Sequence, residues 1–293
     1  MFSNFTSPGL DFLVLSFKEA CQKCAKSTNE EITPLEELVT GVIKTAKARL
    51  LNHEGTALQK AESLQELLFL QTQGVSVKWA DFAISEIMMN DNYSVKMMAY
   101  LAASQFWEPG GDVIMMVTQC LNRDLTGGDV LKKSLALTLI PLIATSSLAE
   151  SVVSNVSLNF NNPNEGIRQK AITCFYKLCI KFPECLPPGI KAMNIKALLA
   201  DSSNPPGVIH SALSLLNELS LHCPGTFKTL LPTLINFFQD SSGSPWILAR
   251  SISIVSKVAA TLEPKAIVKF NQKITSLVHE LLSFTSAPSV VFD

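Results

Sequence analysis

A repeat of about forty residues constrains the fold of this chain more than any other feature of its sequence. Each of six segments begins with a turn rich in Asp, Asn, Ser, Gly or Pro. A helix then opens with an aliphatic residue or Ala, followed by a small residue at +4 and an apolar residue at +7. These positions share one face of a helix. The opening residues, spaced by 38, 35, 37, 41 and 39, are Ala57, Val95, Val130, Ile167, Val208 and Ile247.

A period near 40 is typical of two-helix repeats of HEAT or armadillo type. One helix pair cannot bury its apolar face by itself, so neighbouring pairs must stack. Helical apolar spacing also marks the first helix of each pair, and no strand-like alternation is sustained anywhere. We therefore predict an all-α fold, a right-handed α-α superhelix (a HEAT/armadillo-like solenoid) of about six to seven helix pairs. The predicted first helices are Val77–Met89, Asp112–Arg123, Leu148–Leu158, Gly189–Ala200 and Phe227–Gln239.

Charge and composition argue against several classes of protein. The formal net charge is −1, and Lys and Arg occur in ones and twos. Duplex binding needs a clustered basic face, so we expect no nucleic-acid partner. The sequence has no apolar run of the roughly 18 residues that a membrane span requires. The seven cysteines are an odd number, and we expect them to be buried, reduced, cytosolic thiols.

No set of residues in the sequence carries recognisable chemistry. Cys21 and Cys24 form an isolated C-x-x-C pair, whereas a zinc site needs two more ligands at compatible spacing. No histidine lies in a metal-binding spacing, and the Gly110-Gly111 pair lacks the following Lys-Ser/Thr of a phosphate-binding loop. We predict no catalytic residue, no cofactor and no metal, and therefore a scaffold rather than an enzyme.

Two stretches resemble the N-terminal trunk of adaptin large subunits, the large chains of heterotetrameric adaptor complexes. They are LLFLQTQGVSVKWADFAISEIM (Leu67–Met88) and YSVKMMAYLAASQFWEPGGDVIMMVTQCLNRDL (Tyr93–Leu125). The helix GIRQKAITCFYKLCIKFPECL (Gly166–Leu186) is also similar to the family. The segments TLEPK (Thr261–Lys265) and TSAPSVVFD (Thr285–Asp293) resemble the delta-type large subunit of the third adaptor complex.

The resemblance sets the expected domain organisation. It runs from about residue 38 to residue 293, so we expect a single adaptin-type HEAT-repeat trunk over 38–293. Family members are much longer, and we expect this trunk to be truncated. Residues 1–37 do not follow the family pattern and form an atypical N-terminal segment in this prediction.

The resemblance also implies a function and partners. It implies a cytoplasmic scaffold subunit of a vesicle coat adaptor complex, acting in intracellular protein transport between the Golgi and the endosome, lysosome or vacuole. The expected partners are the second large, medium and small adaptor chains. An Arf-type GTPase would bind the early repeats and bring the complex to the Golgi or endosomal membrane as a peripheral protein.

The family contact with the GTPase aligns with Phe82, Ser85 and Met116. Ser85 replaces the usual aliphatic residue, so neighbouring Ile84 is its nearest apolar substitute. An alternative interpretation places Phe82 and Met116 in the core. Two other function classes stay open: a HEAT-repeat scaffold without adaptor assembly, such as a transport receptor or another coat subunit, and an enzyme with a helical toroid fold. The toroid enzyme would need a convergent acid–base or metal constellation.

Overall fold

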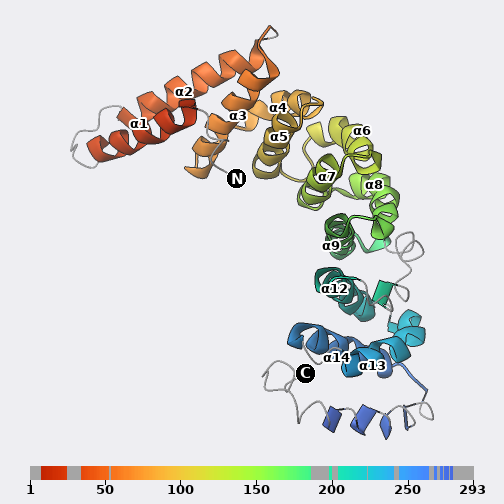
Figure 1. Ribbon diagram of the computed structural model, residues 1–293. Helices are drawn as coiled ribbons and strands as arrows, with labels where there is room; N and C mark the ends of the chain where they lie inside the picture. Colours follow the sequence, from red (N-terminus) through yellow and green to blue (C-terminus); the bar gives the residue numbers. More distant parts are fainter. Residues whose placement is uncertain are drawn as a thin grey trace. The chain divides into compact units, whose positions relative to one another are not determined.

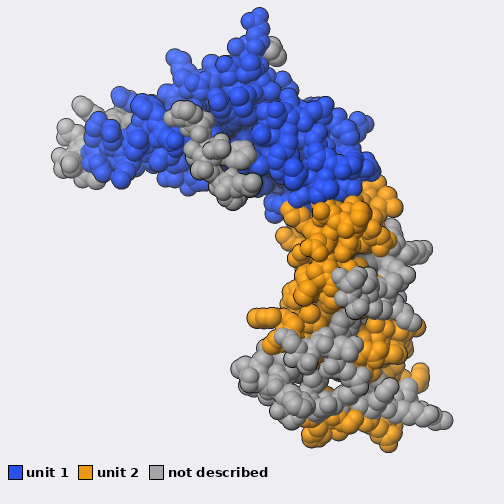
Figure 2. Space-filling view, in the orientation of Figure 1, with its two compact units in different colours: residues 1–148 blue, residues 149–293 orange. Residues whose placement is uncertain are grey.

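The computed structural model describes residues 8–24, 34–52, 54–185, 198–199, 204–222, 224–240 and 244–263, with short stretches between 267 and 279. All regular structure in these ranges is α-helix or 3-10 helix, which confirms the all-α prediction (Figure 1). The chain forms two compact units, Met1–Leu148 and Ala149–Asp293 (Figure 2). Among the described residues, no helix combines the length and apolarity that a membrane crossing needs.

Unit 1 is built from helix pairs that stack in chain order. α2 packs on α3, α4 on α5, and α6 on α7, while α5 also packs on α3 and α7. The N-terminal helix α1 packs on α2 and α3. The bounds are α1 Pro8–Cys24, α2 Pro34–Leu51, α3 Ala57–Thr72, η1 Lys78–Ala80, α4 Asp81–Met88, α5 Tyr93–Phe106, α6 Val113–Thr126 and α7 Val130–Ile143.

Unit 2 continues the same construction. α9, α12 and α14 pack on one another in that order, and α13 packs on α14. α8 carries the boundary between the units within its first turns. The bounds are α8 Ser146–Leu158, η2 Asn159–Asn161, α9 Glu165–Lys181, η3 Pro183–Cys185, α12 Pro206–His222, η4 Pro224–Leu230, α13 Leu231–Asp240 and α14 Pro245–Ala259.

Side-chain caps at the predicted turns explain where the second helices begin. Asn92 Oδ1 accepts a hydrogen bond from the Ser94 N–H at 3.0 Å, and Asn164 Oδ1 accepts one from the Ile167 N–H at 3.1 Å. Asp129 caps α7 in the same way. These bonds satisfy N–H groups that have no partner inside the helix. The turns predicted from sequence are therefore confirmed at these three helix starts.

The register predicted from sequence is wrong in α7. We expected Ser134 at the small position, but Ser134 is half-buried and Val130, the predicted opening residue, is 41% exposed. The fully buried small residue of α7 is Ala136, two residues later, because burial against the neighbouring helix selects the small residue whatever the first aliphatic residue is. In α3 the expected small residue, Ala61, is buried at 5% exposed, and Ser63 is fully buried. The six equivalent small residues, all 0% exposed, are Ser63, Ala99, Ala136, Ala171, Ala212 and Ser251.

Two predicted first helices differ from the structure or lie beyond its description. Gly189–Ala200 falls almost entirely outside the described residues. The predicted helix Phe227–Gln239 is divided: its first residues belong to the 3-10 helix η4, and α13 starts at Leu231. Pro232 lies in the first turn of α13, where a missing N–H costs no helical hydrogen bond. The proline therefore marks a new helix start.

Candidate protein-binding surface

The structure separates the four predicted site residues into two exposed and two buried side chains. Phe82, at the start of α4, is 65% exposed, and Met116, in the first turn of α6, is 49% exposed. Ile84 and Ser85 are 0% and 3% exposed. The interpretation of Phe82 and Met116 as core residues is therefore wrong, whereas Ile84 and Ser85 present almost no side chain to a partner.

Helix geometry explains part of this division. Ile84, two positions after Phe82, points away from its side of α4, while Glu86 and Met89 follow Phe82 at i+4 and i+7 on the same side. Ser85, at i+3, lies nearer to the side of Phe82 but is still buried. Glu86 and Met89 are indeed exposed. Ser85 Oγ instead donates a hydrogen bond to the Phe82 carbonyl at 2.7 Å. A serine at this inward position satisfies its hydroxyl within its own helix, so the absent aliphatic residue leaves no unpaired polar group.

Two exposed methionines enlarge the apolar surface beyond the prediction. Met89 follows α4 and is 46% exposed, and Met115 precedes Met116 on α6 and is 81% exposed. α4 and α6 pack on each other. Flexible, polarizable methionine side chains suit adaptable protein contacts. The helical spacing from Phe82 could have identified Met89, but nothing in the sequence distinguishes exposed Met115 from a core methionine.

A buried polar cluster fixes α6 against α5 beneath this surface. Lys96 Nζ lies 2.8 Å from Asp124 Oδ2, and the two side chains are 0% and 3% exposed. Tyr100 donates a hydrogen bond from its hydroxyl to the same Asp124 oxygen at 2.6 Å. Burial and then the Asp124 charge raise the pKa of Tyr100. The carboxylate thus joins two residues of α5 to one residue of α6.

Cys120 lies in the same cluster and connects it to α4. Its thiol donates to the Met88 carbonyl with a separation of 3.6 Å, and Lys96 Nζ lies 3.7 Å from Sγ. Burial raises the pKa of Cys120, and the positive charge of Lys96 opposes that shift. A thiol kept protonated in this way is a poor nucleophile, since the thiolate is the reactive form.

Polar groups also surround the start of α4. Lys78 and Glu108 form an exposed ion pair at 2.9 Å. Burial raises the pKa of Asp81, while the charge of Lys78 and the indole N–H of Trp107 lower it. That N–H and Asp81 Oδ1 do not reach full hydrogen-bond geometry. Lys47 Nζ lies over the Trp79 ring, 5.5 Å from its centroid, in a cation–π contact. These contacts hold the helix start that presents Phe82.

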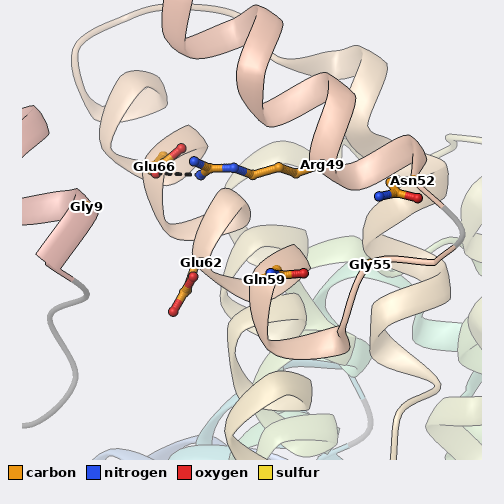
Figure 3. Close-up of a pocket in the computed structure, with 7 residues that line it drawn as sticks. All are labelled: Gly9, Arg49, Asn52, Gly55, Gln59, Glu62 and Glu66. Carbon is orange, nitrogen blue, oxygen red and sulfur yellow. Dashed lines mark hydrogen bonds and ion pairs between the residues drawn. The ribbon is translucent and has the colours of Figure 1, made fainter.

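A cavity of about 560 Å³ lies elsewhere in unit 1, among α1, the end of α2 and the start of α3 (Figure 3). Arg49 Nη1 and Glu66 Oε1 pair across it at 3.1 Å. Gln59 belongs to the capping box of Thr56. Among the polar side chains that line the cavity, Arg49 and Glu66 therefore bond to each other, and Gln59 bonds to Thr56. The lining residues of the cavity are Gly9, Arg49, Asn52, Gly55, Gln59, Glu62 and Glu66.

Among the described residues, no group of three or more His, Cys, Asp or Glu is arranged to hold a metal ion. Cys120, Cys174 and Cys179 are buried and form no disulfide, whereas Cys21 is exposed, so the expectation of a buried thiol is wrong there. Exposed side chains for protein contact are the feature that this surface offers.

Comparison with known proteins matches residues 40–293 to the family described as "Adaptin N terminal region". "AP-3 complex subunit delta-1" of Bos taurus is 30% identical over 234 residues, covering 80% of this chain and 19% of that protein. "AP-3 complex subunit delta" of Saccharomyces cerevisiae is 28% identical over 274 residues, covering 92% and 28%. The chain thus spans less than a third of the length of these relatives.

Comparison with known structures gives the same fold. A homology model of the full-length AP-3 complex in an intermediate open conformation matches with a TM-score of 0.61 and 30% identity, over 81% of this chain and 40% of that one. The crystal structure of an engineered protein matches with a TM-score of 0.57 over 75% of this chain and 97% of that one. At 12% identity, this second match concerns the fold only.

Proposed function

Because this chain belongs to the adaptin family and is similar to AP-3 delta subunits, we propose that it is a scaffold subunit of a vesicle coat adaptor complex. The observation that carries the proposal is the family match over residues 40–293 together with the delta-type relatives. In this proposal residues 38–293 form the scaffold, and its partners are a second large chain, a medium chain and a small chain. It acts in transport between the Golgi and endosomal or vacuolar compartments.

Stacked helix pairs suit such a role. Each pair contacts its neighbours in chain order, so an array presents a long surface built from successive helices. Several chains can bind such a surface side by side. Membrane recruitment in this proposal is peripheral and passes through a partner, an Arf-type GTPase in its GTP state.

Co-purification tests the adaptor assignment. The tagged chain is expressed in its source cell, and native complexes are isolated and identified by mass spectrometry. We expect medium, small and second large adaptor subunits in stoichiometric amounts. Recovery of transport receptors or subunits of another coat in their place would contradict the assignment and favour a HEAT-repeat scaffold of another kind.

Phe82 and Met116 supply the proposed GTPase contact, because they are the exposed members of the predicted set. We expect Phe82→Glu with Met116→Glu to reduce GTP-dependent Arf pull-down at least about tenfold, since two central apolar contacts typically contribute more than 1 kcal/mol each. Circular dichroism and melting should not change, because both side chains already contact water.

A matched control replaces two exposed leucines elsewhere in unit 1. Leu101 on α5 and Leu131 on α7 are 46% and 53% exposed. Leu101→Glu with Leu131→Glu adds the same charge, and we expect it to leave the pull-down intact. We call the exposed side chains of Phe82, Met89, Met115 and Met116 the α4–α6 surface. Equal loss in both double variants would show that added charge, rather than this surface, controls binding. Unchanged binding in Phe82→Glu/Met116→Glu would exclude these residues from the contact.

A further inference from the structure

The second helices of unit 2 carry polar side chains that bond from one helix to the next. α9, α12 and α14 lie side by side in Figure 1, and such bonds cross both junctions, through buried Ser211 at the first. Thr173 Oγ1 on α9 donates to Ser211 Oγ on α12 at 3.4 Å. Asn217 Oδ1 on α12 accepts from Ser253 Oγ at 3.1 Å and Lys257 Nζ at 2.7 Å, both on α14. We call this surface, from Thr173 to Lys257, the α9–α14 face.

Cations outnumber acids on this face. Lys170 and Lys177 are exposed on α9 at i−3 and i+4 from Thr173, and Arg250 is exposed on α14 three residues before Ser253. Lys257 is half-buried at the far end. Over the full lengths of these three helices the acidic residues are Glu165 and Glu218. Complementary charge on a partner would therefore be negative.

An exposed tryptophan lies at one end of the face. Trp246 is 71% exposed and precedes Arg250 by one helical turn on α14. Tryptophan and arginine are the residue types most enriched among energetically dominant interface contacts. A large apolar ring left in water beside a cation indicates a contact surface better than an isolated exposed leucine does.

We propose that the α9–α14 face binds an extended peptide rich in Asp and Glu. Packed helices lie about 8–10 Å apart, and an extended chain advances about 3.3–3.6 Å per residue. About three peptide residues therefore span the distance from one helix to the next, and about six cross from α9 to α14. Acidic side chains six residues apart reach Lys177 and Lys257, or Lys170 and Arg250.

Half-buried hydroxyl and amide groups favour a peptide over a membrane surface. Thr173, Ser214 and Asn217 lie between the cations and are only partly accessible. A narrow peptide chain reaches such groups and can bond its backbone N–H and C=O to them. A flat surface of lipid headgroups would contact the most exposed cations but would not reach these half-buried hydroxyl and amide groups.

Fluorescence anisotropy with the full chain tests the proposal. The probe is a labelled twelve-residue peptide of Asp, Glu, Gly and Ser, and a Lys-containing peptide of the same length serves as its counterpart. We expect saturable binding of the acidic probe, weakened by salt, since exposed charge contacts are screened. Lys177→Glu with Arg250→Glu should weaken binding at least about tenfold, since reversing two contact charges converts attraction into repulsion.

The matched control makes the same charge change elsewhere. Lys44 on α2 and Lys228 on η4 are exposed and lie on other helices. Lys44→Glu with Lys228→Glu should keep binding within about twofold, because net charge changes equally while the face is untouched. Circular dichroism checks that both double variants fold. Trp246→Phe should remove the change in tryptophan emission that accompanies binding.

Three results would overturn the proposal. The first is the absence of saturable binding of the acidic probe at low salt. The second is equal weakening by the face variant and its control, which would mean that net charge governs binding. The third is binding to vesicles containing phosphatidylserine, lost in Lys177→Glu/Arg250→Glu, without binding of the peptide. That result would assign the face to anionic lipid.

Discussion

The two units of this chain place their basic residues in opposite ways on equivalent helices. Three positions before each fully buried small residue, the second helices of unit 1 carry lysines that are 6%, 0% and 9% exposed: Lys60, Lys96 and Lys133. In unit 2 the same position holds half-buried Arg168 on α9, Ile209 on α12 and Leu248 on α14. The basic residues of α9 and α14 lie instead on the outer surface, at Lys170, Lys177 and Arg250.

The difference shows that one repeat template supports two kinds of interior. In unit 1, Lys60 pairs with Glu86 at 2.9 Å and Lys96 pairs with Asp124 at 2.8 Å, so ion pairs join α3 to α4 and α5 to α6. On the second helices of unit 1 the lysines at this position are therefore buried. On α9 and α14 of unit 2, Lys170, Lys177 and Arg250 are exposed instead. Each unit therefore offers partners a different chemistry.

Removal of the Asp124 charge should change the stability of the chain more than any other variant that tests this comparison. We expect Asp124→Asn to lower the free energy of unfolding of unit 1 by about 3–5 kcal/mol, because Lys96 would stay buried without a counter-charge. Urea denaturation followed by circular dichroism measures it. Lys96→Met with Asp124→Leu should recover part of the loss, since it removes the unpaired charge but leaves the buried Tyr100 hydroxyl without its acceptor. A single variant as stable as the parent would contradict a buried ion pair.

The reverse exchange tests unit 2. Leu248 is 3% exposed and occupies the position of the unit 1 lysines. We expect Leu248→Lys to destabilise the chain by about 3 kcal/mol, because a buried lysine without an acid partner must be desolvated or lose its proton. Leu248→Met is the volume-matched control and should cost less than about 1.5 kcal/mol. Equal stability of the two variants would show that α14 tolerates a charge at this site.

A smaller effect concerns the thiols of the two units. Burial raises the pKa of both Cys120 and Cys174 above the ordinary value of 9.0, and the shift is partly opposed at Cys120 by Lys96 and at Cys174 by Lys177. The folded chain therefore keeps thiol protons that the unfolded chain releases near pH 9. This stabilisation is complete below that pH and decreases as the pH rises further.

Alkylation kinetics check this prediction. At pH 8, iodoacetamide should modify exposed Cys21 at least about tenfold faster than Cys120 or Cys174, because buried protonated thiols react slowly. Peptide mass spectrometry assigns each site, and the same reaction in urea should abolish the difference. Rapid labelling of Cys120 in the folded chain would mean that the cluster beneath the α4–α6 surface opens to solvent.

Part of the candidate site could be predicted from sequence. Phe82 and Met116 came from family alignment, and the structure leaves both exposed, but the same alignment pointed to Ser85 and its neighbour Ile84, which are buried. One helical turn contains both environments, so an error of one or two residues reverses exposure. Whether a methionine such as Met115 faces water depends on which neighbouring helix covers it, and local sequence does not contain that information.

Local interactions explain what the sequence by itself determined. Helix starts follow from caps such as Asn92, Asp129 and Asn164, which bond within their own turns. The all-α fold follows from apolar spacing within single helices. Tertiary structure decided the register of α7 and the burial of Lys96. Those outcomes depend on groups such as Asp124, which lies 28 residues away in sequence and meets Lys96 only when α6 packs on the preceding pair.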